Sequence, residues 1–330
     1  MSYYSPATPE VWSGRTSGQG YYYHERITCA DLETWIATEE TEKPVAILGY
    51  ASDEGVRRNQ GRVGAKEGPA VIRERLGKFV CHAPVQKPII DFGDVVCEGN
   101  ELEKAHELVS EKVQQLLAAG CFPILLGGGH DLGYAHCRGI FEYLKAEKPT
   151  AKVGVVNLDA HFDLRAVSGE RNSGTPFYQL SEEYPNIDYL CLGIQPQAND
   201  PDLFAYAHSK GHEYLTEEEC KIANWKAVNE RLEKFATGVE FLYLTIDLDG
   251  FSSAYAPGVS APSPVGLEPN FARKVIEALQ KTEKLISTDI VELNPLFDQD
   301  LATARLAAWL VNGLVVGNSL SPRVDPISNS

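Results

Sequence analysis

Three side chains of the types that bind metal ions alternate directly after an apolar stretch. The stretch, residues 153–158, is short and rich in valine, and Asp159, His161 and Asp163 follow it. Such a run predicts a strand buried on both faces of a sheet, and charges at its end need a partner. Residues two apart in an extended chain point the same way, so we expect the three side chains to converge. Two carboxylates and an imidazole suit Mn, Fe, Co or Zn, although an aspartate that only caps the next helix is the alternative.

Two other segments carry ligand types in similar positions. His130 follows the glycine run 127–129, and Asp247 and Asp249 follow the apolar run 241–246. The glycines let the backbone turn sharply and set His130 at the rim, while Asp247 and Asp249 repeat the alternation. Six ligands are too many for one tetrahedral site and fit two ions that share bridging carboxylates. The sequence therefore predicts a binuclear metal centre.

Alternating strands and helices would position these ligands. Apolar runs predict strands over residues 45–50, 88–92, 121–126, 153–158, 189–193, 241–246 and 285–291. Helical patterns lie near 68–79, 100–119, 132–148, 268–282 and 300–316, with two more between 200 and 237, and 168–185 reads as a loop. This order predicts an α/β fold with a mostly parallel sheet and helices on both faces. Ligands bind beyond the carboxyl ends of strands in such sheets, where these residues fall.

No linker of low complexity divides the chain. We expect residues 44–330 to form a single catalytic domain. Residues 1–43 are rich in Gly, Ser, Thr and Tyr, and we expect them to form an N-terminal extension packed on the body, with a polar helix over 29–42.

Composition narrows the function classes. The 46 acidic and 30 basic residues give a net charge of −16, which argues against nucleic acid and anionic membranes as partners. No apolar run approaches the roughly 20 residues that cross a bilayer. Seven scattered cysteines without a CxxC pair suit reduced thiols, and the start of the chain lacks the pattern of a signal peptide. We therefore expect a cytoplasmic protein, and the sequence leaves a homo-oligomer open.

The three metal motifs resemble those of the ureohydrolase (arginase/agmatinase) family. The segments are Gly127-Gly-Gly-His130-Asp131, Asp159-Ala-His161-Phe-Asp163 and Asp247-Leu-Asp249, and the resemblance runs from about residue 46 to 316. It implies a three-layer αβα arginase-like fold and two Mn²⁺ ions, with Fe²⁺ or Co²⁺ as alternatives. It also implies that His130, Asp159, Asp163 and Asp247 hold one ion. Asp159, His161, Asp247 and Asp249 would hold the other, with Asp159 and Asp247 bridging.

Within this family the chain most resembles the formimidoylglutamase branch. The resemblance lies in residues 12–15, 53–59, 173–177 and 256–262. Arginases and agmatinases usually have His where this chain has Ser173, and they continue the last metal motif into Asp-Pro, where Phe251-Ser252-Ser253 stands here. Both departures argue against guanidine hydrolysis. The branch implies cleavage of N-formimidoyl-L-glutamate to L-glutamate and formamide, with Ser173 at the substrate.

Hydrolysis at such a centre follows from general chemistry. Two divalent ions lower the pKa of a bridging water, and the resulting hydroxide attacks an amidine or guanidine carbon. Asp249 would take the proton and pass it to the leaving amine. Glu292 resembles the family's glutamate that faces the cationic group of the substrate, with helix capping or a salt bridge as its alternative role.

The expected substrate is a small amidine that carries carboxylates, and it needs a cationic partner. Arginine is the natural partner of a carboxylate. Arg57 and Arg62 lie in the loop after the first strand and are our expected substrate-binding residues, with Arg58 and Arg165 as further candidates. A guanidino-substrate ureohydrolase that releases urea, and a metal-holding scaffold without catalysis, are the other hypotheses. The remaining histidines, which follow no predicted strand, are expected not to bind metal: His24, His82, His106, His136, His208 and His212.

Overall fold

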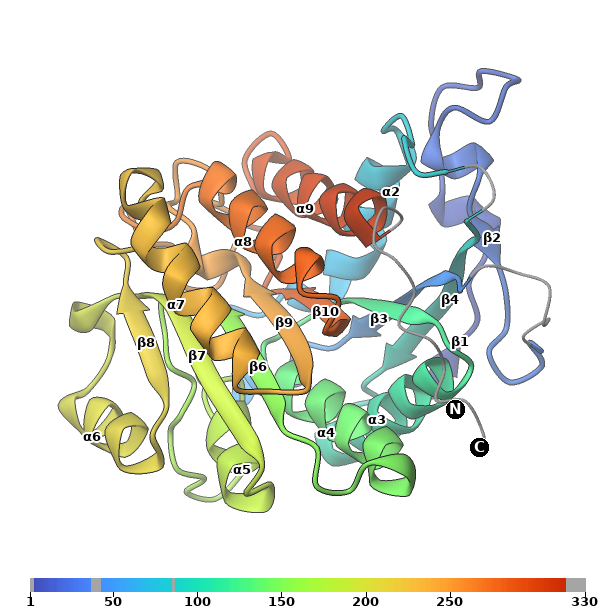
Figure 1. Ribbon diagram of the computed structural model, residues 1–330. Coiled ribbons are helices and arrows are strands. Elements are labelled where there is room, and N and C mark those ends of the chain that lie inside the picture. Colours follow the sequence, from blue (N-terminus) through green and yellow to red (C-terminus); the bar gives the residue numbers. More distant parts are fainter. Residues whose placement is uncertain (1–2, 37–42, 85–86, 319–330) are drawn as a thin grey trace.

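A single ten-stranded sheet organises the described residues of the computed structural model, which are 3–36, 43–84 and 87–318 (Figure 1). The strands are β1 (Tyr4–Ser5), β2 (Thr28–Cys29), β3 (Val45–Ala51), β4 (Ile89–Val96), β5 (Phe122–Leu126), β6 (Val153–Leu158), β7 (Ile187–Ile194), β8 (Glu213–Thr216), β9 (Phe241–Asp247) and β10 (Leu285–Val291). The strand order is β1-β4-β3-β5-β10-β9-β6-β7-β8, and β2 also pairs with β4. Only β1 runs antiparallel to its neighbour, so the predicted mostly parallel sheet is confirmed.

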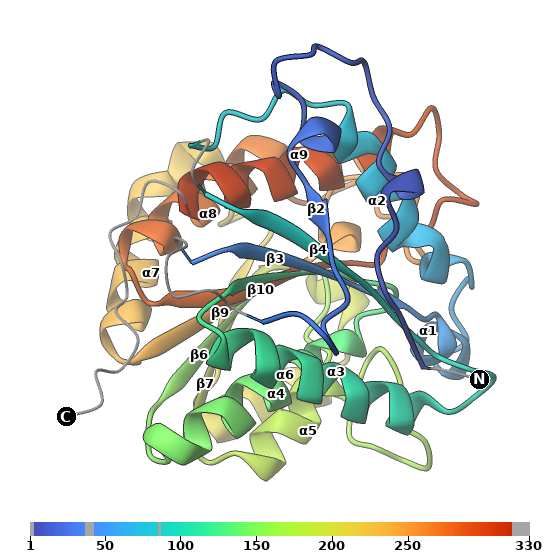
Figure 2. The ribbon, with the colours of Figure 1, turned by 90° about the vertical axis from the view of Figure 1, so that its right-hand side faces the viewer.

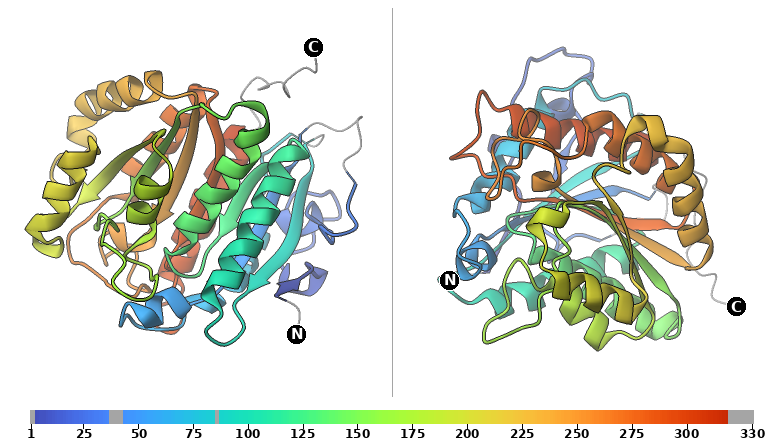
Figure 3. Two further views of the ribbon diagram at one scale, coloured as in Figure 1. Left: turned by 90° about the horizontal axis from the view of Figure 1, so that it is seen from below. Right: turned by 90° about the vertical axis from the view of Figure 1, so that its left-hand side faces the viewer.

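Helices cover both faces of the sheet and complete the three layers (Figure 2). They are α1 (Glu54–Arg58), α2 (Gly68–Gly77), α3 (Leu102–Ala118), α4 (Leu132–Glu147), α5 (Pro176–Glu183), α6 (Pro201–Lys210), α7 (Trp225–Thr237), α8 (Pro269–Lys281) and α9 (Ala302–Asn318). Helices α2, α7, α8 and α9 pack on one face, while α3 to α6 pack on the other. In the left view of Figure 3, α3 and α4 lie side by side across the second face.

Two hydrophobic cores explain why the strands read as unbroken apolar runs. Successive residues of a strand point to opposite faces, so Val45 and Ile47 of β3 enter one core, and Ala46 and Leu48 enter the other. All four side chains are fully buried. Both faces of the central strands therefore exclude water, and the polar ends of these strands become the places where function can reside.

The chain order brings four strand ends together at the centre of the sheet. Strand β10 pairs with β5 on one side and with β9 on the other, and β9 pairs with β6. The predicted ligands and Glu292 lie in the segments after β5, β6, β9 and β10, except Asp247, which is the last residue of β9. Because these strands are parallel and adjacent, their carboxyl ends meet at one edge.

The N-terminal segment contributes to the sheet instead of forming the predicted helix. Thr28 and Cys29 pair with Ile90 and Asp91 of β4, and the described residues 30–36 contain no helix. Asp31 starts a turn there, since its carbonyl accepts from Thr34 N and Trp35 N. The helix predicted over 29–42 is thus wrong up to residue 36, and its remainder, 37–42, lies outside the described residues.

Two smaller elements also differ from the sequence expectations. The segment 168–185, predicted as a loop, contains helix α5, which begins at Pro176. Proline fits the first turn of a helix because its missing N–H has no partner there, so the Pro that suggested a loop marks a helix start. The short edge strand β8 was not predicted, since only part of its surface is buried.

A buried ion pair ties the N-terminal segment to the body. Arg73 Nε lies 2.8 Å from Asp91 Oδ2, and Arg73 Nη1 donates to Asp94 Oδ1 at 2.6 Å. The Trp12 indole donates to the same Asp91 oxygen at 2.8 Å. Arg73 and Asp91 are both almost completely buried. If either side chain were removed, the charge of the other would stay buried away from water.

We expect Arg73→Ala to lower the free energy of unfolding by about 3–5 kcal/mol, because Asp91 would stay buried without its partner. Urea denaturation monitored by circular dichroism measures the change. Arg273→Ala is the matched control, since Arg273 is half exposed on α8 and should change stability by less than about 0.5 kcal/mol. Equal stabilities of the two variants would contradict the expectation.

Candidate metal centre

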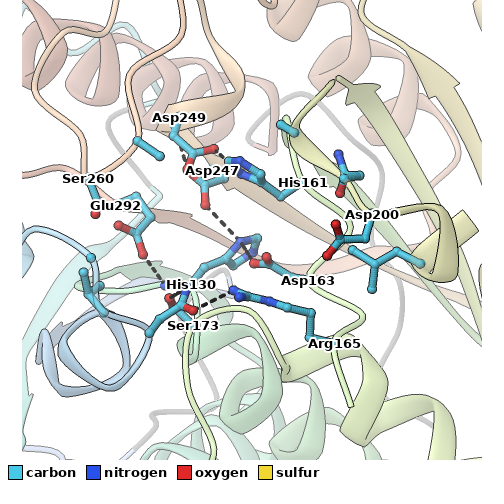
Figure 4. Close-up of a pocket in the computed structure, with 17 residues that line it drawn as sticks. His130, His161, Asp163, Arg165, Ser173, Asp200, Asp247, Asp249, Ser260 and Glu292 are labelled. Carbon is cyan, nitrogen blue, oxygen red and sulfur yellow. Dashed lines mark hydrogen bonds and ion pairs between the residues drawn. The ribbon is translucent and has the colours of Figure 1, made fainter. Parts of the chain in front are cut away.

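Two overlapping groups of ligand atoms lie at the central edge of the sheet. His130, Asp159, Asp163 and Asp247 form the first group, and Asp159, His161 and Asp249 form the second. The atoms within each group lie within 4.8 Å of one another. The structure therefore brings together all six ligands predicted from the sequence, and Asp159 belongs to both groups (Figure 4). Asp247 belongs to the first group only, so its predicted bridging role stays a prediction.

The first group surrounds one nitrogen of His130. Its Nδ1 lies 3.2 Å from Asp159 Oδ2, and 3.0 Å from the Oδ2 atoms of both Asp163 and Asp247. This buried nitrogen has no hydrogen-bond partner of acceptable geometry among the described residues. Spacings near 3 Å equal the edge of an octahedron with metal–ligand bonds of about 2.1 Å. The donor set of carboxylates and imidazoles suits manganese, so the residues present fit a divalent ion.

Neighbouring residues fix the orientation of these ligands. His130 Nε2 lies 3.0 Å from Thr245 Oγ1, which leaves Nδ1 to face the carboxylates. The Asn157 side chain donates to Asp159 Oδ2 at 3.0 Å, and Tyr189 contacts the same amide. Partners of this kind fix the tautomer of a metal-binding histidine and the angle of a carboxylate.

A local turn, not the alternation of an extended strand, aligns the ligands in two of the motifs. Asp159 Oδ1 accepts from the backbone N–H of His161 at 2.7 Å, and Asp247 Oδ1 accepts from the N–H of Asp249 at 2.7 Å. Each aspartate thus holds the residue two positions later, as Asx turns do. Strand β6 has already ended before Asp159, and Asp249 lies in a 3-10 turn. The convergence predicted from the sequence occurs, and its physical reason is different.

Burial and mutual repulsion control the protonation of the metal-free centre. Burial raises the pKa of Asp247, and the carboxylates of Asp249 and Asp159 add to this effect. Burial also raises the pKa values of Asp163 and Asp249. The Asp249 carboxylate raises the pKa of His161 to about 12. Although burial opposes it, the nearby His130 and His161 imidazoles hold the pKa of Asp159 below its usual range.

The Glu292 carboxyl group lies beside the metal ligands and faces the cavity. Its Oε1 accepts from the backbone N–H of His130 at 2.9 Å, one residue before the N-cap Asp131 of α4, so this contact is not a helix cap. Its Oε2 is buried without a hydrogen-bond partner among the described residues. Burial, with a contribution from the Asp249 carboxylate, raises the pKa of Glu292 to about 8. Both Glu292 (φ 68°) and Asp163 (φ 50°) have left-handed backbone conformations, which are strained for residues other than glycine.

A cavity of about 280 Å³ opens onto these groups. Ser173 lines it and is almost buried, as expected for a residue at the substrate. Arg165 and Asp200 also line it, and they lie on the side of the metal ligands away from Glu292 in Figure 4. Asp200 was not predicted from the sequence. Its position after β7, another strand of the same sheet, is the signal that could have found it.

The two arginines expected to bind substrate do not line the cavity. Arg57 forms an ion pair with Glu54 at 2.6 Å, and its side chain is 55% exposed. The Arg62 side chain donates to the carbonyls of Val259 and Ser260, and its guanidinium lies 4.0 Å from the centre of the Phe297 ring. Arg58 also forms ion pairs, with Glu54 and Glu103. A substrate-binding role of Arg57 and Arg62 stays a prediction.

Two histidines that were expected not to bind metal have other partners. His106 Nε2 lies 2.9 Å from Asp131 Oδ2, and His136 Nδ1 lies 2.7 Å from Asp289 Oδ2. Neither belongs to a group of potential metal ligands among the described residues. The described part of the chain contains no helix long and apolar enough to cross a membrane.

The fold and the paired ligand groups define an α/β protein with a binuclear metal centre of the kind used for hydrolysis. The sequence profile of the arginase family matches residues 43–317. The chain belongs to the arginase family.

Relatives resemble the chain over nearly its whole length. The formimidoylglutamase of Geobacillus thermodenitrificans (strain NG80-2) is 40% identical over 325 residues, which are 97% of this chain and 99% of the relative. The formimidoylglutamase of Ralstonia nicotianae is 40% identical over 324 residues, with 95% and 97% covered. The crystal structure of Trypanosoma cruzi formiminoglutamase with Mn²⁺ superimposes with a TM-score of 0.76 at 29% identity, with 89% of this chain and 99% of the other covered.

We expect metal binding to release protons and to become tighter as the pH rises. The raised pKa values of His130, His161, Asp163, Asp247 and Asp249 mean that these groups retain protons to a higher pH than usual, whereas a metal ligand must be deprotonated. Each proton released makes the apparent affinity rise about tenfold per pH unit. Calorimetric titration with Mn²⁺ between pH 6 and 8, in buffers of different ionisation enthalpy, measures both quantities.

Asp247→Ala serves as the control because it removes one ligand, and it should bind less metal at every pH. A wild-type affinity that is constant or falls with rising pH would contradict this account of the centre.

Proposed function

We propose that this chain uses two Mn²⁺ ions to hydrolyse N-formimidoyl-L-glutamate to L-glutamate and formamide. The observation that carries the proposal is the convergence of His130, Asp159, His161, Asp163, Asp247 and Asp249 beside the cavity. Relatives that match nearly the full length are formimidoylglutamases, which supports the choice of substrate. The Trypanosoma cruzi formiminoglutamase structure contains Mn²⁺, which supports the choice of metal. We infer that the six residues hold the two ions, with Asp159 between them.

The reaction adds water across the amidine carbon. A bound pair of divalent ions supplies Lewis acidity and a water molecule of lowered pKa. The carbon gains a bond to oxygen and loses its bond to the glutamate nitrogen, which requires a proton. Asp249 is our candidate to take the proton from water and deliver it to this nitrogen, since its carboxylate lines the cavity and its Oδ1 has only a loose contact, 3.3 Å from His161 Nδ1.

Glu292 is our candidate to bind the amidine. An amidine is protonated at neutral pH and presents N–H donors, and Glu292 Oε2 lacks a donor among the described residues. The raised pKa of Glu292 means that part of its population is protonated near neutral pH in the metal-free protein. A cationic group beside it favours the ionised form. Ser173, on the cavity wall, is a further candidate to contact the substrate.

The wider predictions follow from the same chemistry. We infer that a small-molecule amidine is the partner, and that the chain works in the cytoplasm, because all seven cysteines are unpaired. A homo-oligomer and the division into an extension, 1–43, and a catalytic domain, 44–330, remain predictions.

We expect the purified, manganese-loaded protein to release formamide and glutamate from N-formimidoyl-L-glutamate. Product analysis by chromatography, with arginine, agmatine and a guanidino-carboxylate as parallel substrates, tests this directly. Faster release of urea from any guanidine would replace the proposal with a guanidino-substrate ureohydrolase. Bound metal without turnover of either class would indicate a scaffold.

We expect Glu292→Gln to lower kcat/KM by about 30- to 1000-fold, because a neutral amide cannot compensate the amidinium charge. Burial raises the pKa of Glu292 to about 8 in the metal-free protein and bound cations lower it, so the wild-type kcat/KM should rise as the carboxyl ionises over a pH range below that value. In Glu292→Gln, this titration should no longer contribute to the fall of kcat/KM at low pH. Steady-state rates from pH 6 to 9 measure both, and metal content confirms an intact centre. An unchanged kcat/KM in Glu292→Gln would exclude this role.

A further inference from the structure

One positively charged side chain without an acidic partner faces the cavity. Of the described lining residues, only Arg165 is an arginine or lysine. Arg165 forms no ion pair with any described acidic residue, unlike Arg57 and Arg58. Its charge is therefore available to a ligand. Glu292 lies on the other side of the metal ligands in Figure 4, so a carboxylate would be repelled there and attracted to Arg165.

Asn59 connects this guanidinium to Ser173. The Asn59 Oδ1 atom accepts from Arg165 Nη2 at 2.6 Å, and the Asn59 Nδ2 atom donates to Ser173 Oγ at 2.9 Å. Because the Ser173 oxygen accepts from the amide, its hydroxyl hydrogen is left to donate, and no described residue accepts it. The Asn59 amide thus holds two donor groups on the same wall of the cavity, the charged guanidinium of Arg165 and the neutral hydroxyl of Ser173.

Backbone contacts hold this wall in place. Asn59 follows α1, and its N–H donates to the Gly55 carbonyl, which also accepts from Ser173 N at 3.2 Å. The Arg165 N–H donates to the Gly174 carbonyl at 3.0 Å. A Cβ atom at Gly174 would lie only 1.9 Å from Arg165 Nη2, so the guanidinium packs directly against the backbone there. The position of Arg165 therefore depends on both Asn59 and Gly174.

We propose that Asn59 is a positioning residue that holds Arg165 and Ser173 together as a carboxylate-binding subsite, an inference that rests on the proposed function for its substrate. A guanidinium and a hydroxyl match the two oxygens of a carboxylate. The subsite would hold a carboxylate of the substrate while its amidine lies between the metal ligands and Glu292. It would make the enzyme select amidines that carry an acid.

Asn59→Asp tests the subsite with almost no change in shape. An aspartate would pair with Arg165 and accept the Ser173 hydroxyl, so both donors would be lost to the ligand. We expect KM for N-formimidoyl-L-glutamate to rise about 10- to 100-fold with kcat changed less than about threefold. Turnover of N-formimidoyl-propylamine, which carries no carboxylate, should not fall in parallel. Steady-state kinetics on both substrates measures this selectivity.

Gly174→Ala provides a second route to the same result, because it displaces Arg165 without removing a polar group. Arg165→Lys, which keeps the charge, should lose less than Arg165→Ala. Arg273→Ala, on the exposed surface of α8, is the control that should keep the wild-type KM. Metal content and the unfolding midpoint establish that each variant is folded.

Two results would overturn the subsite. One is a folded, metal-loaded Asn59→Asp protein that keeps the wild-type KM or loses both substrates equally. The other is a rise in KM for Arg57→Ala or Arg62→Ala with none for Arg165→Ala. Binding of L-glutamate, measured by calorimetry on the metal-loaded protein, separates this inference from the proposed function. If the wild type does not cleave formimidoylglutamate, tighter binding of glutamate to the wild type than to Asn59→Asp would still support the subsite.

Discussion

Crowding of buried carboxylates at one edge of the sheet is the constraint on which the rest of this structure depends. Asp159, Asp247 and Asp249 are almost inaccessible to water, and only the two histidines offset their charge among the described ligand groups. Buried charges of one sign are costly unless protons or cations neutralise them. In the metal-free protein this cost raises the pKa of Asp247, because the protonated carboxyl carries no charge. A pair of divalent ions removes the repulsion. The same buried carboxylates therefore destabilise the metal-free fold and favour metal binding.

The cavity wall divides into two regions of different chemistry. One region contains the metal ligands and Glu292, which attract cations, and the other presents Arg165 beside Asn59 and Ser173. A substrate that carries an amidine at one end and an acid at the other matches both regions. Under the proposed function, this polarity would give the substrate a single orientation, which a uniformly acidic cavity would not do. The strand ends carry the potential metal ligands, whereas the loops after β3 and β6 carry Asn59, Arg165 and Ser173, to which we assign the selectivity.

The sequence predicted the convergence of the six candidate ligand side chains because their signal is local. Asp159, His161 and Asp163 stand together after a recognisable buried strand, and so do Asp247 and Asp249. The geometry of extended chains predicts their convergence, whereas the turns at Asp159 and Asp247 produce it. The left-handed backbone of Asp163 could not be predicted, because only the surrounding structure selects it.

Contacts between distant segments were harder to predict. The choice of Arg57 and Arg62 rested on their type and their place after a strand, but Glu54 and the carbonyls of Val259 and Ser260 occupy them. The helix expected over residues 29–42 is absent up to residue 36, because Cys29 pairs with β4 and a turn begins at Asp31. The strand order was also beyond the sequence, since no local signal places β10 between β5 and β9.

That order has a consequence for how the protein matures. Strands β5 and β6 are consecutive parallel strands in the chain, yet β9 and β10 separate them in the finished sheet. During synthesis, the first two ligand segments emerge well before the strands that must lie between them. A ribosome-bound chain that ends before residue 285 lacks the strand that joins its two halves. Manganese acquisition is therefore expected only after β10 has been synthesised, and free metal at that moment would assist the final closure of the sheet.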